Sequence, residues 1–303
     1  MILNNAQSPL LNSLAKPNVH IIVKYLIAGS SGQLAKAFIA RFEQAGIAYS
    51  APPESVFDIT NTQSVADTVA DVAPDVIINC AAYNAVDAAE VDSKPAFLIN
   101  AEAVKSLAHA AKQHGIPLVH YGSDYVFDGK TDRLYTEEDP TVPLNAYGKS
   151  KRAGEIALAE TGADFLLLRL SWVYGNGNQN FFHKMLQWTE GRDILKVVWD
   201  QISVPTYAED IVTYTLLALD KGLRGTYHLT NTGYASRYEV ARHFFRCMQK
   251  DITVIPVGSE AFPSPVQRPF FSAMSNKKLA AALGVEIPSW EDAVERFAKT
   301  LKA

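Results

Sequence analysis

The apolar residues of the chain form two kinds of pattern, which alternate over the first 170 residues. Short continuous runs rich in leucine or β-branched residues are typical of strands buried on both faces of a parallel sheet, and they cover residues 19–28, 75–79, 117–121 and 165–170. Between these runs the apolar residues recur at helical spacing, as Leu34, Phe38 and Phe42 do. This spacing predicts helices over residues 33–45, 62–72, 94–114 and 146–161. A further short apolar stretch covers residues 47–49.

The alternation of strands and helices predicts an α/β fold, a doubly wound parallel sheet of the Rossmann type. After residue 170 the alternation is lost and aromatic, glycine and asparagine residues crowd together, so we expect a smaller C-terminal substrate-binding α/β region there. The expected division is an N-terminal extension of residues 1–20, a dinucleotide-binding domain of residues 21–170 to which residues 195–225 return, and a substrate-binding domain of residues 171–194 and 226–303.

Charge and cysteine content narrow the classes of function. The chain carries 28 basic and 32 acidic residues, a net charge of −4, and shows no basic stripe, so we expect no binding of nucleic acid. Its two cysteines, Cys80 and Cys247, form neither a disulfide framework nor a zinc-type spacing, so no metal ligands are assigned. No apolar run is long enough to span a bilayer, and the N-terminus lacks the features of a secretory signal. We therefore expect a cytoplasmic protein without a membrane partner.

A glycine-rich turn joins the first predicted strand to the first predicted helix, with Gly29, Gly32 and Ala35 at three-residue spacing. Such a turn lets the backbone approach a pyrophosphate, and the helix N-terminus offers N–H groups to it. Dinucleotide-binding folds usually place an acidic residue at the end of the second strand, which is absent here, and Asp58 is a better candidate for contacting adenine. The choice between NADH and NADPH stays open.

A catalytic group is predicted by two polar clusters. Tyr147 and Lys151 are four residues apart on a predicted helix, so their side chains share one face, and an ammonium next to a phenol lowers the phenol pKa. Ser123 and Asp124 follow a predicted strand at the carboxyl edge of the sheet, where a hydroxyl can hydrogen-bond a substrate carbonyl. Each pair alone also fits a solvated helix face or a turn, but their order after the glycine turn favours catalysis.

These motifs occur in an order that resembles the extended short-chain dehydrogenase/reductase superfamily and, within it, the dTDP-4-dehydrorhamnose reductases. The resemblance extends from residue 25 onward and rests on seven strings, at residues 28–33, 79–87, 123–129, 147–151, 171–175, 180–181 and 268–269. It implies NADPH- or NADH-dependent reduction of the C4 ketone of dTDP-4-dehydro-L-rhamnose to dTDP-L-rhamnose, and it makes the substrate-binding domain a nucleotide-sugar-binding one.

The resemblance also implies roles for individual residues. The catalytic ones are Tyr147 as proton donor, Lys151 as the group that lowers its pKa and binds ribose, and Ser123 as the group that polarises the carbonyl. The implied cofactor-binding residues, besides Tyr147 and Lys151, are Gly29, Ser31, Gly32, Gln33, Leu34, Asp58, Ile59, Ala81, Ala82, Tyr83 and Asn100. The implied substrate-binding residues are Ser123, Asp124, Trp172, Asn180, Phe181 and Arg268.

The chain departs from the family pattern at three positions. Ala35 replaces the third glycine of the turn, Arg237 stands where the family usually has an aromatic residue, and Ala37 stands where some relatives carry a glutamate associated with Mg²⁺ and a dimer. Mg²⁺ is therefore a doubtful cofactor, and both a monomer and a homodimer stay open. Two other kinds of function also stay open. One is a different nucleotide-sugar reductase, epimerase or dehydratase; the other is a non-catalytic NADP-binding regulatory subunit like that of methionine adenosyltransferase.

Overall fold

The computed structural model describes residues 23–177 and 180–302, and its centre is a six-stranded parallel sheet. The strand order is β10-β5-β4-β3-β1-β2, and every pairing is parallel. The strands are β1 (Tyr25–Ala28), β2 (Tyr49–Ser50), β3 (Val76–Asn79), β4 (Leu118–Ser123), β5 (Phe165–Leu170) and β10 (Gly225–His228). The direction of winding reverses between β1 and β3, which is where such sheets bind ligands. The predicted Rossmann-type fold is confirmed.

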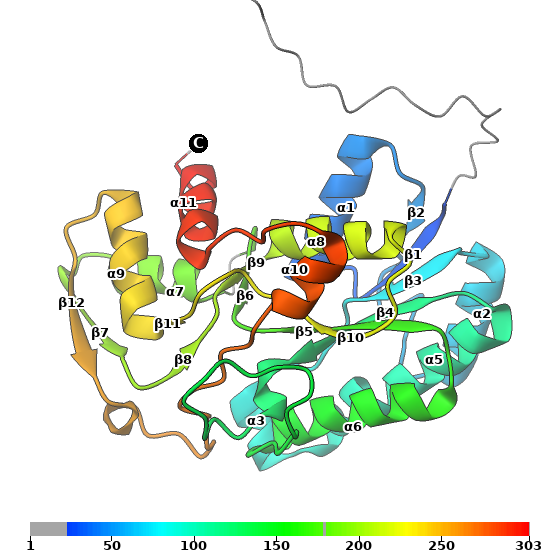
Figure 1. The fold of residues 1–303 in the computed structure, drawn as a ribbon, viewed down its shortest axis with the longest axis horizontal. Helices are drawn as coiled ribbons and strands as arrows, with labels where there is room; N and C mark the ends of the chain where they lie inside the picture. The colour runs from blue at the N-terminus through cyan, green and yellow to red at the C-terminus, as the bar shows by residue number, and fades with distance from the viewer. Residues whose placement is uncertain (1–22, 178–179, 303) are drawn as a thin grey trace, which may run out of the picture.

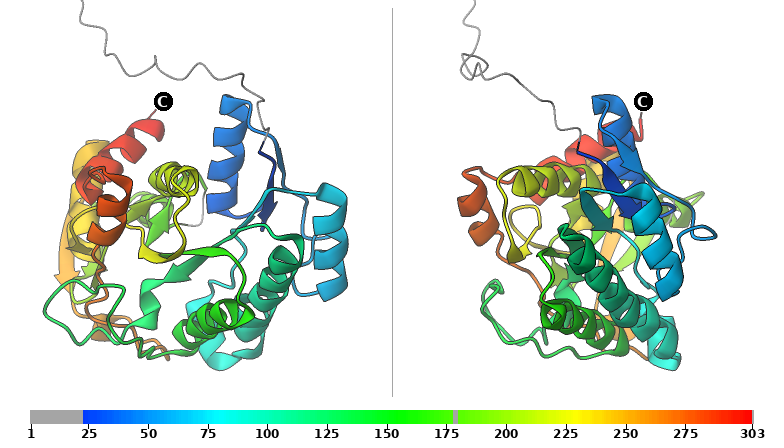
Figure 2. Two further views of the ribbon diagram at one scale, coloured as in Figure 1. Left: turned by 45° about the vertical axis from the view of Figure 1, so that its right-hand side comes forward. Right: turned by 90° about the vertical axis from the view of Figure 1, so that its right-hand side faces the viewer.

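Helices cover both faces of this sheet, as Figures 1 and 2 show. One face packs against α1 (Gln33–Ala45), α8 (Ala208–Asp220) and α10 (Lys277–Leu283). Phe38 and Phe42 of α1 are fully buried against the sheet. The other face packs against α2 (Thr62–Val72), α5 (Ala103–His114) and α6 (Ala146–Thr161). Both cores are apolar side chains from strands buried on two sides, which explains the continuous apolar runs in the sequence.

The first strand and one helix differ from the expected bounds. The strand predicted over residues 19–28 is β1 only from Tyr25, and residues 19–22, like the whole extension of residues 1–20, lie outside the described residues. The helix predicted over residues 94–114 is divided into α4 (Lys94–Phe97), a π-helical turn η1 (Leu98–Glu102) and α5. A π turn is a single wider turn within an otherwise α-helical segment, and it is too short to change the apolar period visibly, so the sequence pattern does not reveal it.

The second half of the chain builds a smaller body beside the sheet, seen on the left of Figure 1. Its strands form three short pairs, and its core is largely aromatic, with Phe182, Phe244 and Phe297 buried. The strand pairs are β6 (Val173–Tyr174) with β9 (Thr206–Tyr207), β7 (Ile194–Val198) with β12 (Thr253–Val257), and β8 (Ile202–Ser203) with β11 (Ala235–Ser236). Its helices are α7 (Phe181–Trp188), α9 (Arg237–Met248) and α11 (Trp290–Thr300).

The chain crosses between the two bodies several times. The segment expected to return to the sheet was residues 195–225; in the structure, α8 and β10 return to it, whereas β7 pairs with β12 in the smaller body. Three short helices complete the fold, α3 (Val86–Val91), η2 (Asp124–Val126) and η3 (Ser259–Ala261). Within residues 23–177 and 180–302, no helix is both long and apolar enough to cross a bilayer.

Candidate active site

The glycine turn brings the ends of β1 and β3 into direct contact. Gly29 has φ +76°, and a Cβ atom there would lie 2.7 Å from the backbone N and Cα of Ala81, so only glycine fits. Gly32 precedes α1 in an extended conformation, and no side chain caps that helix. The first N–H groups of α1 are therefore available to an anion such as a pyrophosphate. This geometry fits the predicted dinucleotide site.

The predicted cofactor residues on the next strand are held by buried amides. The Asn79 Oδ1 accepts a hydrogen bond of 3.1 Å from the Ala81 N–H, which orders the segment after β3. Asn100, in the π turn, contacts the Tyr83 backbone twice, with Oδ1 2.9 Å from its N and Nδ2 3.1 Å from its O. Asn100 is buried, so it supports the cavity wall from behind. Ala82 lies in that wall.

Three other predicted cofactor positions, Asp58, Ile59 and Ser31, do not line this wall. The Asp58 Oδ1 accepts hydrogen bonds from the Thr60 N–H and hydroxyl, at 2.9 and 2.7 Å, so it fixes the turn before α2. Ile59 is buried beside α2, and Ser31 is exposed on the glycine turn. The Ser30 hydroxyl, in the glycine turn, donates to the carbonyl of Pro52, which lies just after β2, at 3.0 Å. These contacts do not distinguish NADH from NADPH.

Tyr147, Lys151 and Ser123 come together at the carboxyl edge of the sheet, and all three are buried. Burial raises the pKa of the Tyr147 phenol above its ordinary value, an effect that the Ser123 hydroxyl partly offsets. The Tyr147 hydroxyl donates to the Asn84 Oδ1 at 3.3 Å. In the free protein Tyr147 therefore keeps its proton at neutral pH.

Lys151 is held below Tyr147 by the sheet. Its Nζ donates a 2.6 Å hydrogen bond to the Tyr121 carbonyl oxygen. Burial lowers the pKa of the ammonium to about 8, while the nearby Glu155 acts in the opposite direction. The sequence predicts that Lys151 lowers the Tyr147 pKa, but in this structure burial dominates at Tyr147 and the ammonium bonds a backbone carbonyl.

Asp124 is a buried carboxylate surrounded by hydroxyl groups. Its Oδ2 accepts hydrogen bonds of 2.8 Å from Ser203 and 2.6 Å from Ser272, and its Oδ1 accepts one of 3.3 Å from Ser123. Burial raises its pKa to about 6, although the three serines act to lower it. Ser203 and Ser272 belong to the smaller body, so Asp124 joins the two bodies at the site. Both serines lie too far along the chain for sequence spacing to identify them.

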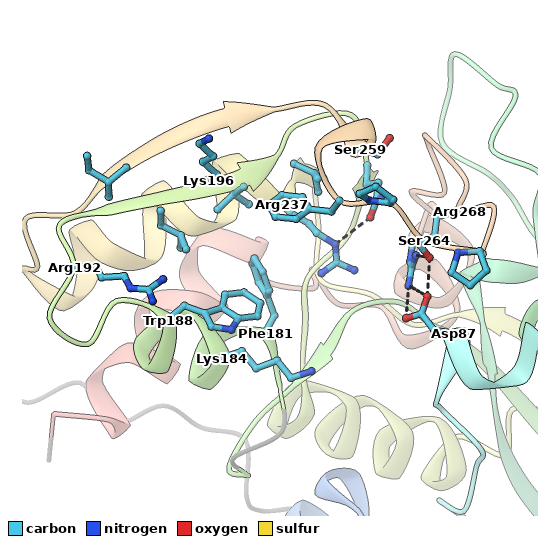
Figure 3. Close-up of a pocket in the computed structure, with 18 residues that line it drawn as sticks. Asp87, Phe181, Lys184, Trp188, Arg192, Lys196, Arg237, Ser259, Ser264 and Arg268 are labelled. Atoms are coloured by element: carbon cyan, nitrogen blue, oxygen red, sulfur yellow. Dashed lines mark hydrogen bonds and ion pairs between the residues drawn. The ribbon is translucent and has the colours of Figure 1, made fainter. Parts of the chain in front are cut away.

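Two cavities meet at this edge. The smaller, about 340 Å³, contains the catalytic group, and the larger, about 1010 Å³, lies between α7, β7 and the segment before Arg268. The predicted residues that line the smaller cavity are Gly32, Gln33, Leu34, Ala81, Ala82, Ser123, Asp124, Tyr147, Lys151 and Trp172. Phe181 and Arg268 line the larger one (Figure 3). Gly29, Ser31, Asp58, Ile59, Tyr83, Asn100 and Asn180 line neither.

Two of the predicted substrate-binding residues, Asn180 and Arg268, already have partners. The Asn180 side chain caps α7, accepting from Phe182 N–H at 3.1 Å and donating to the Gly175 carbonyl at 2.8 Å. The Arg268 Nη2 donates to both carboxylate oxygens of Asp87, each at 2.8 Å, as drawn in Figure 3. This ion pair joins α3 to the segment between η3 and α10 in the lining of the larger cavity, so an arriving anion competes with Asp87 for Arg268.

The structure adds residues that the sequence patterns did not single out as site residues. Asn84 contacts the Tyr147 hydroxyl, and its only sequence signal is its place in the string at residues 79–87. Arg237 lines both cavities. Three further basic residues, Lys184, Arg192 and Lys196, line the larger cavity, against the single acid Asp87 among its described lining residues. Figure 3 shows Arg192 at the far end of the cavity from Arg268.

A magnesium site at position 37 does not fit this chain. Ala37 lies on the buried side of α1, is 8% exposed and offers no side-chain oxygen ligand. No step of the chemistry is therefore assigned to Mg²⁺.

The glycine turn, the strand-end serine and the tyrosine–lysine pair follow one another along the sheet as in extended short-chain dehydrogenases/reductases, the class that the fold and the site define. Within this class, the sequence model described as the RmlD substrate binding domain matches residues 23–303. The chain belongs to this family, whose curated members include dTDP-4-dehydrorhamnose reductases.

Three comparisons give the extent of the similarity. The dTDP-4-dehydrorhamnose reductase of Burkholderia thailandensis is 37% identical over 289 residues, which cover 90% of this chain and 97% of that protein. A crystal structure of dTDP-4-dehydrorhamnose reductase from Bacillus anthracis in complex with NADP matches with a TM-score of 0.89 at 34% identity, covering 93% of this chain and 99% of that one. The structure of a Clostridium acetobutylicum dTDP-4-dehydrorhamnose reductase also matches with a TM-score of 0.89, at 34% identity, covering 93% and 100%.

Proposed function

We propose that this protein reduces the C4 ketone of dTDP-4-dehydro-L-rhamnose to dTDP-L-rhamnose with a hydride from NADPH or NADH. The observation that carries the proposal is the convergence of Tyr147, Ser123 and Lys151 in one buried cavity beside an uncapped helix N-terminus. The membership of the family supports the same reaction. We place the activity in the cytoplasm and propose a monomer or a homodimer as the active form.

In this proposal the turn at Gly29 and Gly32 holds the pyrophosphate, and the segment of Ala81, Ala82 and Tyr83 lies along the cofactor. Ser31, Gln33, Leu34, Asp58, Ile59 and Asn100 complete or support that site. The cofactor supplies the hydride. The Lys151 ammonium holds the nicotinamide ribose. Residues 171–194 and 226–303 hold the nucleotide sugar, through Trp172, Asn180, Phe181 and Arg268.

Proton transfer follows from the hydrogen-bonding state of the site. The Ser123 hydroxyl donates to the substrate carbonyl oxygen as negative charge develops on it. Tyr147, which burial keeps protonated, gives its proton to that oxygen, so an O–H bond forms and a phenolate remains. The new C–H bond at C4 comes from the hydride that the cofactor supplies. The nearby Lys151 ammonium then stabilises the phenolate until solvent returns the proton.

The carboxylate content of the smaller cavity favours a reductase over a dehydratase. Elimination of water needs an acid–base pair beside the tyrosine. Among the described residues, Asp124 is the only carboxylate that lines this cavity, and two serine hydroxyls already bond its Oδ2. Asp124 is proposed instead as a contact for a sugar hydroxyl.

A coupled assay tests the proposed reaction. Purified protein receives dTDP-4-dehydro-6-deoxy-glucose, a 3,5-epimerase and NADPH or NADH, and cofactor oxidation is followed together with product identification. We expect dTDP-rhamnose to form, and Tyr147→Phe to lower kcat by about 10²–10⁴-fold with little change in NADPH affinity. Tyr227→Phe, on the edge strand β10, is the matched control and should retain activity. Cofactor binding without oxidation would point instead to another nucleotide sugar or to a non-catalytic partner.

A further inference from the structure

Arg237 occupies the junction between the two cavities. Of the residues that the structure describes, it alone lines both the cavity of the catalytic group and the larger basic cavity. It is the first residue of α9, and the preceding Ser236 caps that helix with Glu239, so the helix start and the arginine backbone are fixed. The Arg237 N–H also bonds the Gln201 carbonyl at 3.4 Å. Its position is therefore set by two elements of the smaller body.

The guanidinium of Arg237 is oriented by aromatic rings. Its Cζ lies 4.3 Å from the centre of the Trp172 ring and 5.3 Å from that of Phe181. Its Nε donates to the Gln201 Oε1 at 3.3 Å, and the Tyr125 phenol, which also lines the smaller cavity, interacts with the guanidinium and acts to raise its pKa. The aromatic rings contact the faces of the guanidinium and Gln201 contacts its Nε, so the terminal Nη groups are directed toward a ligand. Figure 3 shows the side chain extending toward the centre of the larger cavity.

Trp172 extends this arrangement into the smaller cavity. It is not a glycine, yet its φ is +38°, a conformation that surrounding contacts must maintain. Its side chain lines the cavity that contains Tyr147 and Ser123. The Arg237 guanidinium on the indole face is one of those contacts. A ligand that binds Arg237 is therefore coupled, through Trp172, to the wall of the catalytic cavity.

We propose that Arg237 binds the diphosphate of the substrate where the two cavities meet and, by stacking on Trp172, positions the wall of the sugar cavity. This inference rests on the proposed function, because a nucleoside diphosphate sugar with its ketone at Tyr147 and its nucleoside in the larger cavity must pass its diphosphate between them. A guanidinium binds phosphate oxygens in a bidentate manner, and Arg268 is an alternative cation in the lining of the larger cavity. Arg237 makes the protein selective for diphosphate-linked sugars.

Binding measurements with simple probes test the diphosphate contact. We compare dTDP and thymidine by calorimetry on the full chain, with wild type, Arg237→Met and Arg242→Met. Arg242 is an exposed arginine of the same helix that lies 5.6 Å from the Tyr238 ring, so it is a matched control outside the cavities. Arg237→Met should weaken dTDP binding by about ten- to a hundredfold and leave thymidine and NADPH binding unchanged, since charge-assisted hydrogen bonds are worth about 1.5–3 kcal/mol. Unchanged dTDP affinity in Arg237→Met overturns the proposal.

A second variant tests the coupling to Trp172. Arg237→Lys keeps the positive charge but loses the planar face that stacks on the indole. Lysine contacts phosphate only as a point charge, so we expect a dTDP affinity between those of wild type and Arg237→Met, together with a lower kcat on the dTDP-linked ketone. A wild-type kcat overturns the positioning role. The two proposals fail separately. A wild type that binds dTDP through Arg237 but turns over no ketone refutes the proposed function alone, whereas an active Arg237→Met enzyme with normal dTDP affinity refutes this inference alone.

Discussion

Gly154 provides a test of how α6 is placed against the π turn. A Cβ atom at this position would lie 1.9 Å from the Asn100 carbonyl oxygen, a distance that real structures do not contain. The obstacle is backbone and cannot rotate away, so Gly154→Ala must displace α6 or the turn. Asn100 Nδ2 donates to the Ser150 hydroxyl at 3.0 Å, and Ser150 donates to the Tyr147 carbonyl at 2.7 Å. The displacement therefore reaches the proposed proton donor.

The size of the effect can be worked out from competing terms. Alanine is favoured over glycine inside a helix by about 0.5–1 kcal/mol. Overpacking costs about 1–3 kcal/mol, and each weakened hydrogen bond costs about 0.5–1.5 kcal/mol more. With two weakened hydrogen bonds, the balance is a loss of roughly 1–5 kcal/mol. For a chain of this length the entropy of unfolding is about 0.6 kcal/mol/K, so this loss corresponds to a fall in Tm of roughly 2–8 °C. A misplacement of Tyr147 by about 1 Å would lower kcat by about 100-fold.

Calorimetry and the coupled assay measure the two effects. Lys149→Ala, at an exposed position of the same helix, is the control and should leave both Tm and kcat near the wild-type values. If Gly154→Ala raises Tm, as helix propensity alone would predict, and retains full kcat, then the close contact between α6 and the π turn does not position Tyr147.

Two further predictions concern charge. Burial lowers the pKa of Lys151 to about 8, so its ammonium is present below that pH and is lost as the pH rises through it. The NADPH affinity of the wild type should therefore fall above about pH 8. Lys151→Met should bind NADPH weakly at every pH. Fluorescence titration across this range measures both, and a flat wild-type profile would remove Lys151 from ribose binding. Asp87→Asn should lower the KM for the nucleotide sugar by up to about fivefold, because it frees Arg268 from an exposed ion pair worth about 0–1 kcal/mol. Steady-state kinetics measure this, and a raised KM would mean that Asp87 itself supports the substrate.

The parts of the fold that the sequence predicts are those determined by local patterns. The buried strands β3 and β5 are continuous apolar runs, and the side of α1 that carries Phe38 and Phe42 is regular, so their positions follow from burial alone. The edge strand β10 (Gly225–His228), by contrast, has the sequence GTYH, and three of its residues are half-buried. It contains no apolar run that would predict a strand. Pairing with β5 makes it a strand, and that pairing is a tertiary contact.

The candidate site divides in the same way. Tyr147 and Lys151 are found by their spacing on one helix, and Ser123 by its place at a strand end. The contact of Asn84 with Tyr147 joins positions 63 residues apart, and the pair of Arg268 with Asp87 joins positions 181 apart. No local pattern encodes such contacts, so the sequence alone leaves Arg237 as an unexplained departure from the family.

Burial favours the protonated form of Tyr147, which is the form that the proposed reduction requires. A reductase needs a proton donor that is still protonated when the ketone arrives, and burial raises the pKa of Tyr147 in the free protein. A site built for oxidation would instead need the phenolate beforehand, and a lysine ammonium next to the phenol would provide it. Here the Lys151 ammonium bonds the Tyr121 carbonyl, and its own pKa is lowered by the same burial. In the proposed reaction, its charge would stabilise the phenolate that proton transfer creates, so the electrostatic stabilisation would be greatest after the proton has left Tyr147.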